Sequence, residues 1–269
     1  MSDTESEDAV QDMKSRPLVE HLTELRRRLL WSFVTMMAGT IFCYLNVQKI
    51  YGFLVEPLAH AMGPGSTDRL IYTGLTEAFF TYIKVAFFAG TFLTFPILAV
   101  QIWKFVAPGL YKNERRAFLP YLIATPVLFF CGGAMVYYVI LPLAWPFFLS
   151  FQSTASQTVL PIQLEARVGE YLDLIMTLIF AFGLCFQMPV IFSLLGRVGL
   201  VTSQGLIKTR RYAIVGIFII AAFLTPPDMM SQICLAVPML ALYEISIFLV
   251  KKVERNKDTH DKDAQDSQS

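Results

Sequence analysis

Two carboxylates lie in a short charged stretch just ahead of the first long apolar run of the sequence. The stretch, "PLVEHLTELRRRLL", carries Glu20 and Glu24, followed by three consecutive arginines. Residues four apart share one face of a helix, so the two carboxylates lie together and Glu24 can also pair with Arg28. A carboxylate is the preferred partner of a guanidinium, which it binds through two parallel hydrogen bonds. These residues predict either a solvated turn beside a membrane helix or a site for an incoming cation.

A further acid, Glu114, lies in the segment "APGLYKNERR". The Pro108-Gly109 pair predicts a turn between two apolar runs, and Glu114 is followed by two arginines that it could simply neutralise. Together with Glu20 and Glu24, however, it predicts one surface on which acids lie against a basic background. Such a surface would suit a partner that carries arginines.

The elements that must position these acids are predicted to be membrane-spanning helices. The chain has 269 residues, of which 55% are apolar, and its mean hydropathy of +0.53 is typical of a polytopic membrane protein. A spanning helix needs roughly 20 mostly apolar residues. The last two apolar runs of the sequence, Tyr212–Leu224 and Ser231–Val250, are short, which predicts a locally thin bilayer or a shallow hairpin there. We expect an all-α protein with six spans: Leu29–Val47, Ala78–Ile102, Ala117–Leu141, Tyr171–Leu195, Tyr212–Leu224 and Ser231–Val250.

The orientation follows from the basic residues. Nearly all lysines and arginines fall in the loops on one side of these spans, whereas the opposite loops hold Lys49, Arg69 and Arg167. Because basic loops stay in the cytoplasm, this asymmetry predicts that both termini are cytoplasmic. The polar ends, 1–16 and 253–269, are predicted to be disordered tails around a membrane domain at 17–252. The acidic N-terminus does not resemble a cleavable signal peptide.

Two loops on the outer side are rich in apolar residues. The segment "KIYGFLVEPLAHAMG" has apolar residues near helical spacing, which indicates an amphipathic helix on the outer membrane surface. The long loop Pro142–Gly169 contains "WPFFLSF", an aromatic run that suits an interfacial cap.

Inside the predicted spans, the polar side chains that are costly to bury in a membrane are Lys84, Gln187 and Glu244. Ionisable residues at membrane depth usually face protein or water and are functional candidates by default. For Lys84 the alternative is a side chain that extends to the outer interface. Prolines within the spans bend helices, which favours a curved wall over a straight bundle.

Metal, cofactor and enzyme sites are not predicted. The cysteines lie singly in apolar runs and the histidines in separate segments, without metal-ligand spacing or a nucleophile partner. The net charge of +1 indicates no nucleic-acid partner. A secondary transporter or channel for a small solute remains an alternative, because six spans with Lys84, Glu244 and Gln187 are compatible with one. The paired broken helices typical of many transporters are not evident in the sequence.

The motifs "HLTELRRRLL", "EPL", "FVAPGLYKNERR", "FGLCFQMPV", "LTPPD" and "YEI", in this order, resemble the TatC family. TatC is the multi-spanning core of the bacterial twin-arginine protein translocase. The resemblance implies a receptor that binds twin-arginine signal peptides of folded precursors and supports their export using the proton-motive force. It also implies an inner-membrane location, a concave, glove- or cup-like shape, and assembly with single-span TatA and TatB subunits and further copies of the chain.

The resemblance also implies roles for single residues. The acids matching Glu24 and Glu114 hold the arginine pair in the family, and we group Glu20, Arg26 and Phe105 with them as signal-peptide-binding candidates. Phe105 would face the apolar part of the signal. Structural or assembly roles are expected for six further residues: Pro57, Pro108, Gln187, Asp228, Glu244 and Lys84.

The chain departs from the family pattern at Gln187. Many relatives carry "FExP" in the fourth span, whereas this sequence has "FQMP". An amide cannot titrate, so a proton relay at this position is not expected, but the amide can form hydrogen bonds. Gln187 is therefore a candidate docking point for single-span partners, since interhelical hydrogen bonds help to fix association in lipid.

Overall fold

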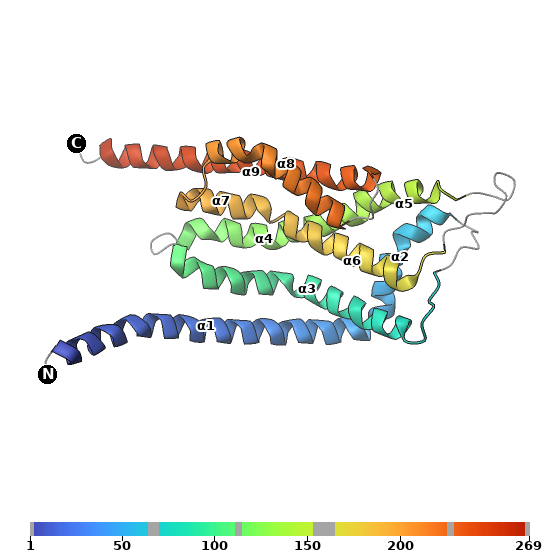
Figure 1. Ribbon diagram of the computed structural model, residues 1–269, viewed down its shortest axis with the longest axis horizontal. Coiled ribbons are helices and arrows are strands. Elements are labelled where there is room, and N and C mark those ends of the chain that lie inside the picture. Colours follow the sequence, from blue (N-terminus) through green and yellow to red (C-terminus); the bar gives the residue numbers. More distant parts are fainter. Residues whose placement is uncertain (1–2, 64–69, 111–114, 153–164, 225–228, 267–269) are drawn as a thin grey trace.

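The computed structural model describes residues 3–63, 70–110, 115–152, 165–224 and 229–266 (Figure 1). These residues form helices joined by short connections, with one isolated β-bridge between Ile71 and Arg167. The all-α prediction is therefore confirmed for the described part of the chain. The elements are α1 (Asp3–Leu45), α2 (Val47–Met62), α3 (Glu77–Leu110), α4 (Arg115–Met135), the π-helix η1 (Val136–Ile140), α5 (Leu141–Leu149), α6 (Val168–Cys185), α7 (Met188–Val198), α8 (Ser203–Leu224) and α9 (Met229–Asp266).

Five helical stretches of the described chain are long and apolar enough to cross a membrane: Leu22–Leu45, Glu77–Lys104, Leu119–Leu149, Val168–Val198 and Gln232–Arg255. They match five of the predicted spans. The remaining one, Tyr212–Leu224, is the second half of α8, whose first half carries Lys208, Arg210 and Arg211. Because these charges dilute the apolar character of α8, the sixth span stays a prediction. The helix does pack along α9, as expected for a hairpin.

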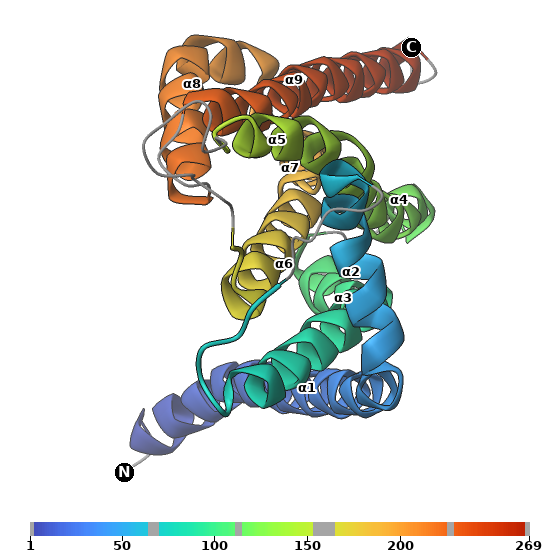
Figure 2. The same cartoon turned by 90° about the vertical axis from the view of Figure 1, so that its right-hand side faces the viewer.

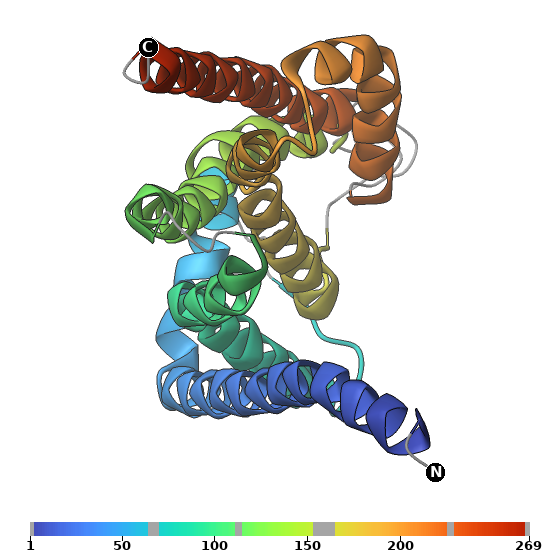
Figure 3. The ribbon, with the colours of Figure 1, turned by 90° about the vertical axis from the view of Figure 1, so that its left-hand side faces the viewer.

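The long helices form an open row rather than a closed bundle (Figures 2 and 3). Helix α1 packs on α3, α3 on α4 and α6, α7 on α9, and α9 on α8. Only 11% of the most apolar part of α1 is buried, against 50% for the α6–α7 stretch. The α6–α7 stretch is therefore the centre of the row and α1 is one edge. The first turn of α1 and the last turn of α9 lie at the same end of the molecule (Figure 1).

Helices α1 and α9 continue into the segments predicted to be tails. Helix α1 begins at Asp3 and α9 ends at Asp266, whereas the sequence predicts disorder over 1–16 and 253–269. An isolated helix gains little stability without tertiary packing. The division into a membrane domain and two tails therefore stays a prediction.

Small residues allow the closest helix contacts. A Cβ atom added at Gly90 on α3 would lie 2.5 Å from the backbone nitrogen of Thr40 on α1, and one at Gly132 on α4 would lie 2.6 Å from the carbonyl oxygen of Phe182 on α6. No larger residue fits either position without moving a backbone. Such contacts are the usual basis of helix packing in lipid, where burial of apolar surface provides no driving force between helices.

Helix α2 lies across the ends of the long helices, opposite the termini (Figure 1). It contains Pro57, which has no N–H to donate to the carbonyl of Phe53, four residues earlier. The hydroxyl of Tyr137 in η1 donates to this Phe53 carbonyl at 2.8 Å, and that of Tyr171 in α6 donates to the Leu54 carbonyl at 3.1 Å. Two tyrosines thus attach α2 to the membrane helices, and the structural role of Pro57 stays a prediction.

The start of α8 is capped by a residue from another helix. Both carboxylate oxygens of Glu254 on α9 accept hydrogen bonds from Ser203, one from its backbone N–H at 2.8 Å and one from its hydroxyl at 2.5 Å. The first N–H groups of a helix lack partners within it, and negative charge is favourable there. Glu254 therefore fixes α8 against α9.

We expect Tyr137→Phe to lower the stability of the protein. The substitution keeps the ring, which stacks on Phe53 with centroids 4.3 Å apart, but it leaves the Phe53 carbonyl without its donor. A buried acceptor that loses its partner costs about 1–3 kcal/mol. Thermal unfolding in detergent measures the effect, with Tyr138→Phe as the matched control, because Tyr138 is 68% exposed. Equal unfolding temperatures for the two variants would contradict the assigned role of Tyr137.

Glu254→Ala should loosen the first turn of α8. Loss of an N-terminal cap costs about 0.5–2 kcal/mol, and here it also removes a link between two helices. Hydrogen exchange should be faster over 203–209 than in the wild type. The control is Lys252→Ala, an exposed neighbour on the same helix. Unchanged exchange in the Glu254 variant would show that the cap does not hold α8.

Candidate functional site

Glu24 on α1 is paired with Arg28, one turn further along the helix. The Nε atom of Arg28 donates to Oε1 of Glu24 at 3.1 Å, and its NH2 group donates to the same oxygen. The pair expected from the spacing is therefore confirmed. The Glu24 side chain is 41% exposed and that of Arg28 21% exposed. The carboxylate thus holds a guanidinium and can still be approached from solvent.

Arg28 also reaches the neighbouring helix. Its NH1 group lies 3.5 Å from Oε1 of Gln101 on α3, a long hydrogen bond. Two residues further on, the Trp103 indole N–H donates to the hydroxyl of Thr125 on α4 at 2.9 Å. The candidate site therefore lies where α1, α3 and α4 are tied together. Sequence analysis missed Gln101, because a contact between residues 73 positions apart leaves no local pattern.

Several predicted site residues lie outside the described residues. Glu114 and Asp228 are among them, and so are the side chains of Glu20, Phe105 and Pro108. The helix ends that flank 111–114 lie at the same end of the molecule as the start of α1 (Figure 1). The expected proximity of Glu114 to Glu24 stays a prediction. Arg26, on the turn between Glu24 and Arg28, is exposed.

The charged residues predicted inside the spans both have partners on neighbouring helices. Lys84 on α3 lies 2.7 Å from the carboxylate of Asp173 on α6, and both side chains are about half exposed. Glu244 on α9 lies 2.8 Å from Arg210 on α8. Pairing is the usual state of ionisable groups at membrane depth. The structural or assembly roles expected for Lys84 and Glu244 stay predictions.

A second group of charges joins α3 to α6 at the α2 end of the molecule. The carboxylate of Glu77 accepts hydrogen bonds from the N–H groups of Thr73 and Gly74, and it pairs with Arg167 at 3.3 Å. Arg167 also pairs with Glu170 at 2.8 Å. The hydrogen bond to Glu77 raises the pKa of the Arg167 guanidinium above its ordinary value. The guanidinium therefore stays charged at any physiological pH, and the network fixes the segment ahead of α3.

Gln187 occupies the break between α6 and α7 and is 7% exposed. Its amide nitrogen donates to the carbonyls of Thr125 at 3.1 Å and Gly183 at 3.3 Å. Its Oε1 atom has no hydrogen-bond partner in the described structure. The amide therefore links the break to α4 and is buried inside the protein. This burial favours a structural role over direct docking of a partner helix.

The described charges can bind other charged groups but do not form a metal site. Among the described residues, no three histidine, cysteine, aspartate or glutamate side chains gather closely enough to hold an ion. What the geometry offers is a partly exposed carboxylate, Glu24, in contact with a guanidinium. That arrangement suits recognition of an arginine.

Comparison with known proteins decides between the function classes. Residues 20–238 match the family model described as "Sec-independent protein translocase protein (TatC)". The chain is 49% identical over 241 residues to the TatC protein of Magnetococcus marinus, with 90% of this chain and 86% of that one covered. It is 38% identical over 234 residues to the TatC protein of Escherichia coli K12, covering 87% of this chain and 88% of that one.

The fold agrees with this assignment. A solved structure described as the twin-arginine translocase receptor TatC superimposes with a TM-score of 0.75 and is 33% identical in sequence, covering 87% of this chain and 99% of that one. The function is therefore that of a protein translocase component, a transport role, and not that of a small-solute transporter. The chain belongs to the TatC family of Sec-independent protein translocase proteins.

Proposed function

We propose that this chain is the signal-peptide receptor and core subunit of a twin-arginine translocase in a bacterial inner membrane. Both termini and the Glu24 end of the molecule would face the cytoplasm, and α8 would supply the sixth span. The single observation that carries the proposal is the Glu24–Arg28 pair, a partly exposed carboxylate that already binds a guanidinium. The same bonds would hold an arginine of a signal peptide.

The proposed recognition step is an exchange of guanidinium groups. An incoming arginine replaces Arg28 on Glu24, and Arg28 keeps its contact with Gln101 on α3. Because one guanidinium replaces another, the Glu24 carboxylate stays paired throughout, whereas Arg28 gives up its carboxylate partner and keeps the neutral amide of Gln101. Glu114 holds the second arginine of the signal, while Glu20, Arg26 and Phe105 contribute to the same surface.

Further parts of the translocase would bind along the edges of the helix row. Helix α1 leaves most of its apolar surface uncovered, including Trp31, Val34 and Phe42. Single-span TatA and TatB subunits, further copies of this chain or lipid would cover it. Pro57, Gln187, Lys84 and Glu244 maintain the shape of the row, and we propose the same role for Pro108 and Asp228. The concave, glove-like surface would receive the apolar part of the signal, and the proton-motive force would drive export.

Glu24→Ala should weaken binding of a twin-arginine peptide by roughly 10- to 100-fold, because a hydrogen bond to a charged group contributes about 1.5–3 kcal/mol. Glu114→Ala should act in the same direction. Photo-crosslinking from positions beside Glu24 and Glu114 to a twin-arginine precursor measures the contact, and a twin-lysine precursor is the ligand control because lysine lacks the planar fork. Glu170→Ala, an exposed acid at the opposite end, is the matched protein control. Normal export by the Glu24 and Glu114 double variant would refute the role of both acids.

Gln187→Leu should destabilise the break between α6 and α7, since the Thr125 and Gly183 carbonyls lose their shared donor. We expect a lower unfolding temperature and unchanged peptide binding. Gln187→Glu, which restores the acid of many relatives, is the matched variant of similar size. If Gln187→Leu unfolds like the wild type but no longer co-purifies with TatB, the residue docks a partner and is not primarily structural.

A further inference from the structure

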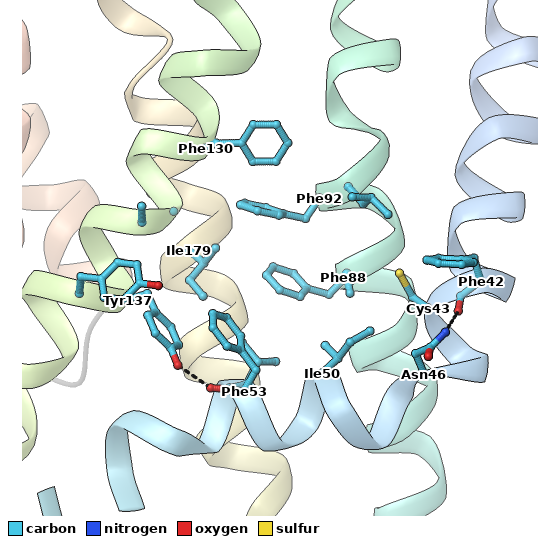
Figure 4. A pocket seen from close by; sticks show the side chains of 16 residues that line it. Phe42, Cys43, Asn46, Ile50, Phe53, Phe88, Phe92, Phe130, Tyr137 and Ile179 are labelled. Carbon is cyan, nitrogen blue, oxygen red and sulfur yellow. Dashed lines mark hydrogen bonds between the residues drawn. The ribbon is translucent and has the colours of Figure 1, made fainter. Parts of the chain in front are cut away.

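An apolar cavity opens between α1, α2, α3, η1 and α6 at the α2 end of the helix row (Figure 4). Its volume is about 450 Å³, within the range of ligand pockets. The side chains of Phe53, Phe88, Phe92, Phe130 and Ile179 surround it (Figure 4). Asn46 carries the one amide in the lining, and its Nδ2 group already donates to the Phe42 carbonyl at 3.2 Å. The cavity therefore suits an apolar occupant.

A second cavity of about 540 Å³ adjoins the first; its walls are mostly apolar but include the charged side chain of Glu56. Glu56 and His60 of α2 line it, and their side chains lie 3.7 Å apart. The two cavities share Phe53, Tyr137 and Tyr138 as lining residues. The stacked rings of Phe53 and Tyr137 thus form part of the common wall, with an apolar space on one side and a carboxylate on the other. This pairing of environments fits an amphiphilic molecule.

The apolar cavity lies at the depth of lipid tails. Its lining comes from the interior of the candidate spans Glu77–Lys104 and Leu119–Leu149 and from the end of Leu22–Leu45. The second cavity is instead lined by α2, η1 and α5, where α2 passes across the helix ends. The pair of cavities therefore runs from the membrane interior to its interface on the α2 side.

The apolar cavity is accessible from the bilayer. Phe42, Leu93 and Tyr138 at its edge are exposed side chains, whereas Leu54 and Gly133 behind them are buried. Walls that face an empty space lose their dispersion contacts, so a neighbouring molecule is favoured there. A helix about 10 Å wide would fill such a volume with roughly one turn, so an acyl chain fits better than a partner helix.

We propose that one phospholipid of the leaflet on the α2 side binds in these cavities, with an acyl chain in the apolar one and an amine-bearing headgroup beside Glu56. An acyl chain gains little free energy by leaving other acyl chains, so the headgroup must provide the selectivity. The Glu56 side chain is 56% exposed, and its carboxylate lies 3.3 Å from the Tyr137 hydroxyl, which donates its proton at shorter range to the Phe53 carbonyl. His60 is the one basic side chain in this lining, so a primary amine complements the site better than an anionic headgroup.

The test uses the full chain in vesicles of phosphatidylethanolamine and phosphatidylglycerol. A small fraction of phosphatidylethanolamine carries a diazirine on one acyl chain, and mass spectrometry maps the crosslinked peptides after irradiation. We expect labelling to concentrate on the lining segments of α3 and of α4–η1. Labelling spread evenly over every exposed apolar face would overturn the proposal.

Two variants separate the tail from the headgroup. Ala134 lines the apolar cavity from an exposed position, so Ala134→Phe should fill the cavity and reduce labelling of its walls to the bulk-lipid background. Ala241→Phe, at an exposed position on α9, is the matched control and should label like the wild type. Unfolding temperatures confirm that both variants fold. Labelling unchanged by Ala134→Phe would overturn the tail site.

The headgroup is tested by Glu56→Gln and by a phosphatidylcholine probe with the same diazirine. A trimethylated amine cannot donate a hydrogen bond to a carboxylate, so the wild type should label more strongly with the ethanolamine probe. Glu56→Gln should remove this preference while keeping the crosslinked positions. Equal labelling by both probes in the wild type would overturn the headgroup assignment. A photo-reactive residue at position 134 that captured only protein would show that a polypeptide occupies the cavity and would also overturn the proposal.

Discussion

The absence of water in the hydrocarbon core constrains every polar group that the membrane helices carry. A backbone or side-chain group without a partner there costs several kcal/mol, so a partner inside the chain is strongly favoured. Lys84 meets Asp173, Glu244 meets Arg210, and the Gln187 amide meets the Thr125 carbonyl. The first and third of these contacts join helices that are not consecutive in the sequence, and the second joins the consecutive helices α8 and α9. These polar contacts therefore add to the apolar packing that holds neighbouring helices together in the open row.

The same constraint explains how one imino acid organises the α2 end of the molecule. Pro57 removes an N–H from α2, and the Phe53 carbonyl that it leaves unpaired accepts the Tyr137 hydroxyl. That bond holds the Tyr137 ring against Phe53. The two rings line both the apolar cavity and the second cavity, which contains Glu56. The N–H that Pro57 lacks is thus replaced by the Tyr137 hydroxyl, and this hydrogen bond positions a ring that lines the proposed lipid site.

Local patterns in the sequence predicted the features that depend on neighbouring residues. The length of apolar runs located five spans, and a spacing of four residues paired Glu24 with Arg28. Partners such as Asp173 for Lys84, 89 positions away, were not predictable because they depend on how two helices are rotated and shifted against each other. The sixth span stays a prediction for a different reason. The basic residues that favour a cytoplasmic start for α8 also reduce its hydropathy, so the two signals compete.

The Glu24 site differs from the Lys84 and Glu244 pairs in the origin of its partner. Lys84, Glu244 and their partners connect separate helices, so breaking them would loosen the row. Arg28, which pairs with Glu24, comes from the same helix, one turn away, and α1 keeps its backbone hydrogen bonds if that pair opens. An arginine from outside can therefore take the place of Arg28 at little structural cost. This makes the Glu24 pair, among the described charge pairs at membrane level, the one best suited to exchange its partner in the proposed recognition step.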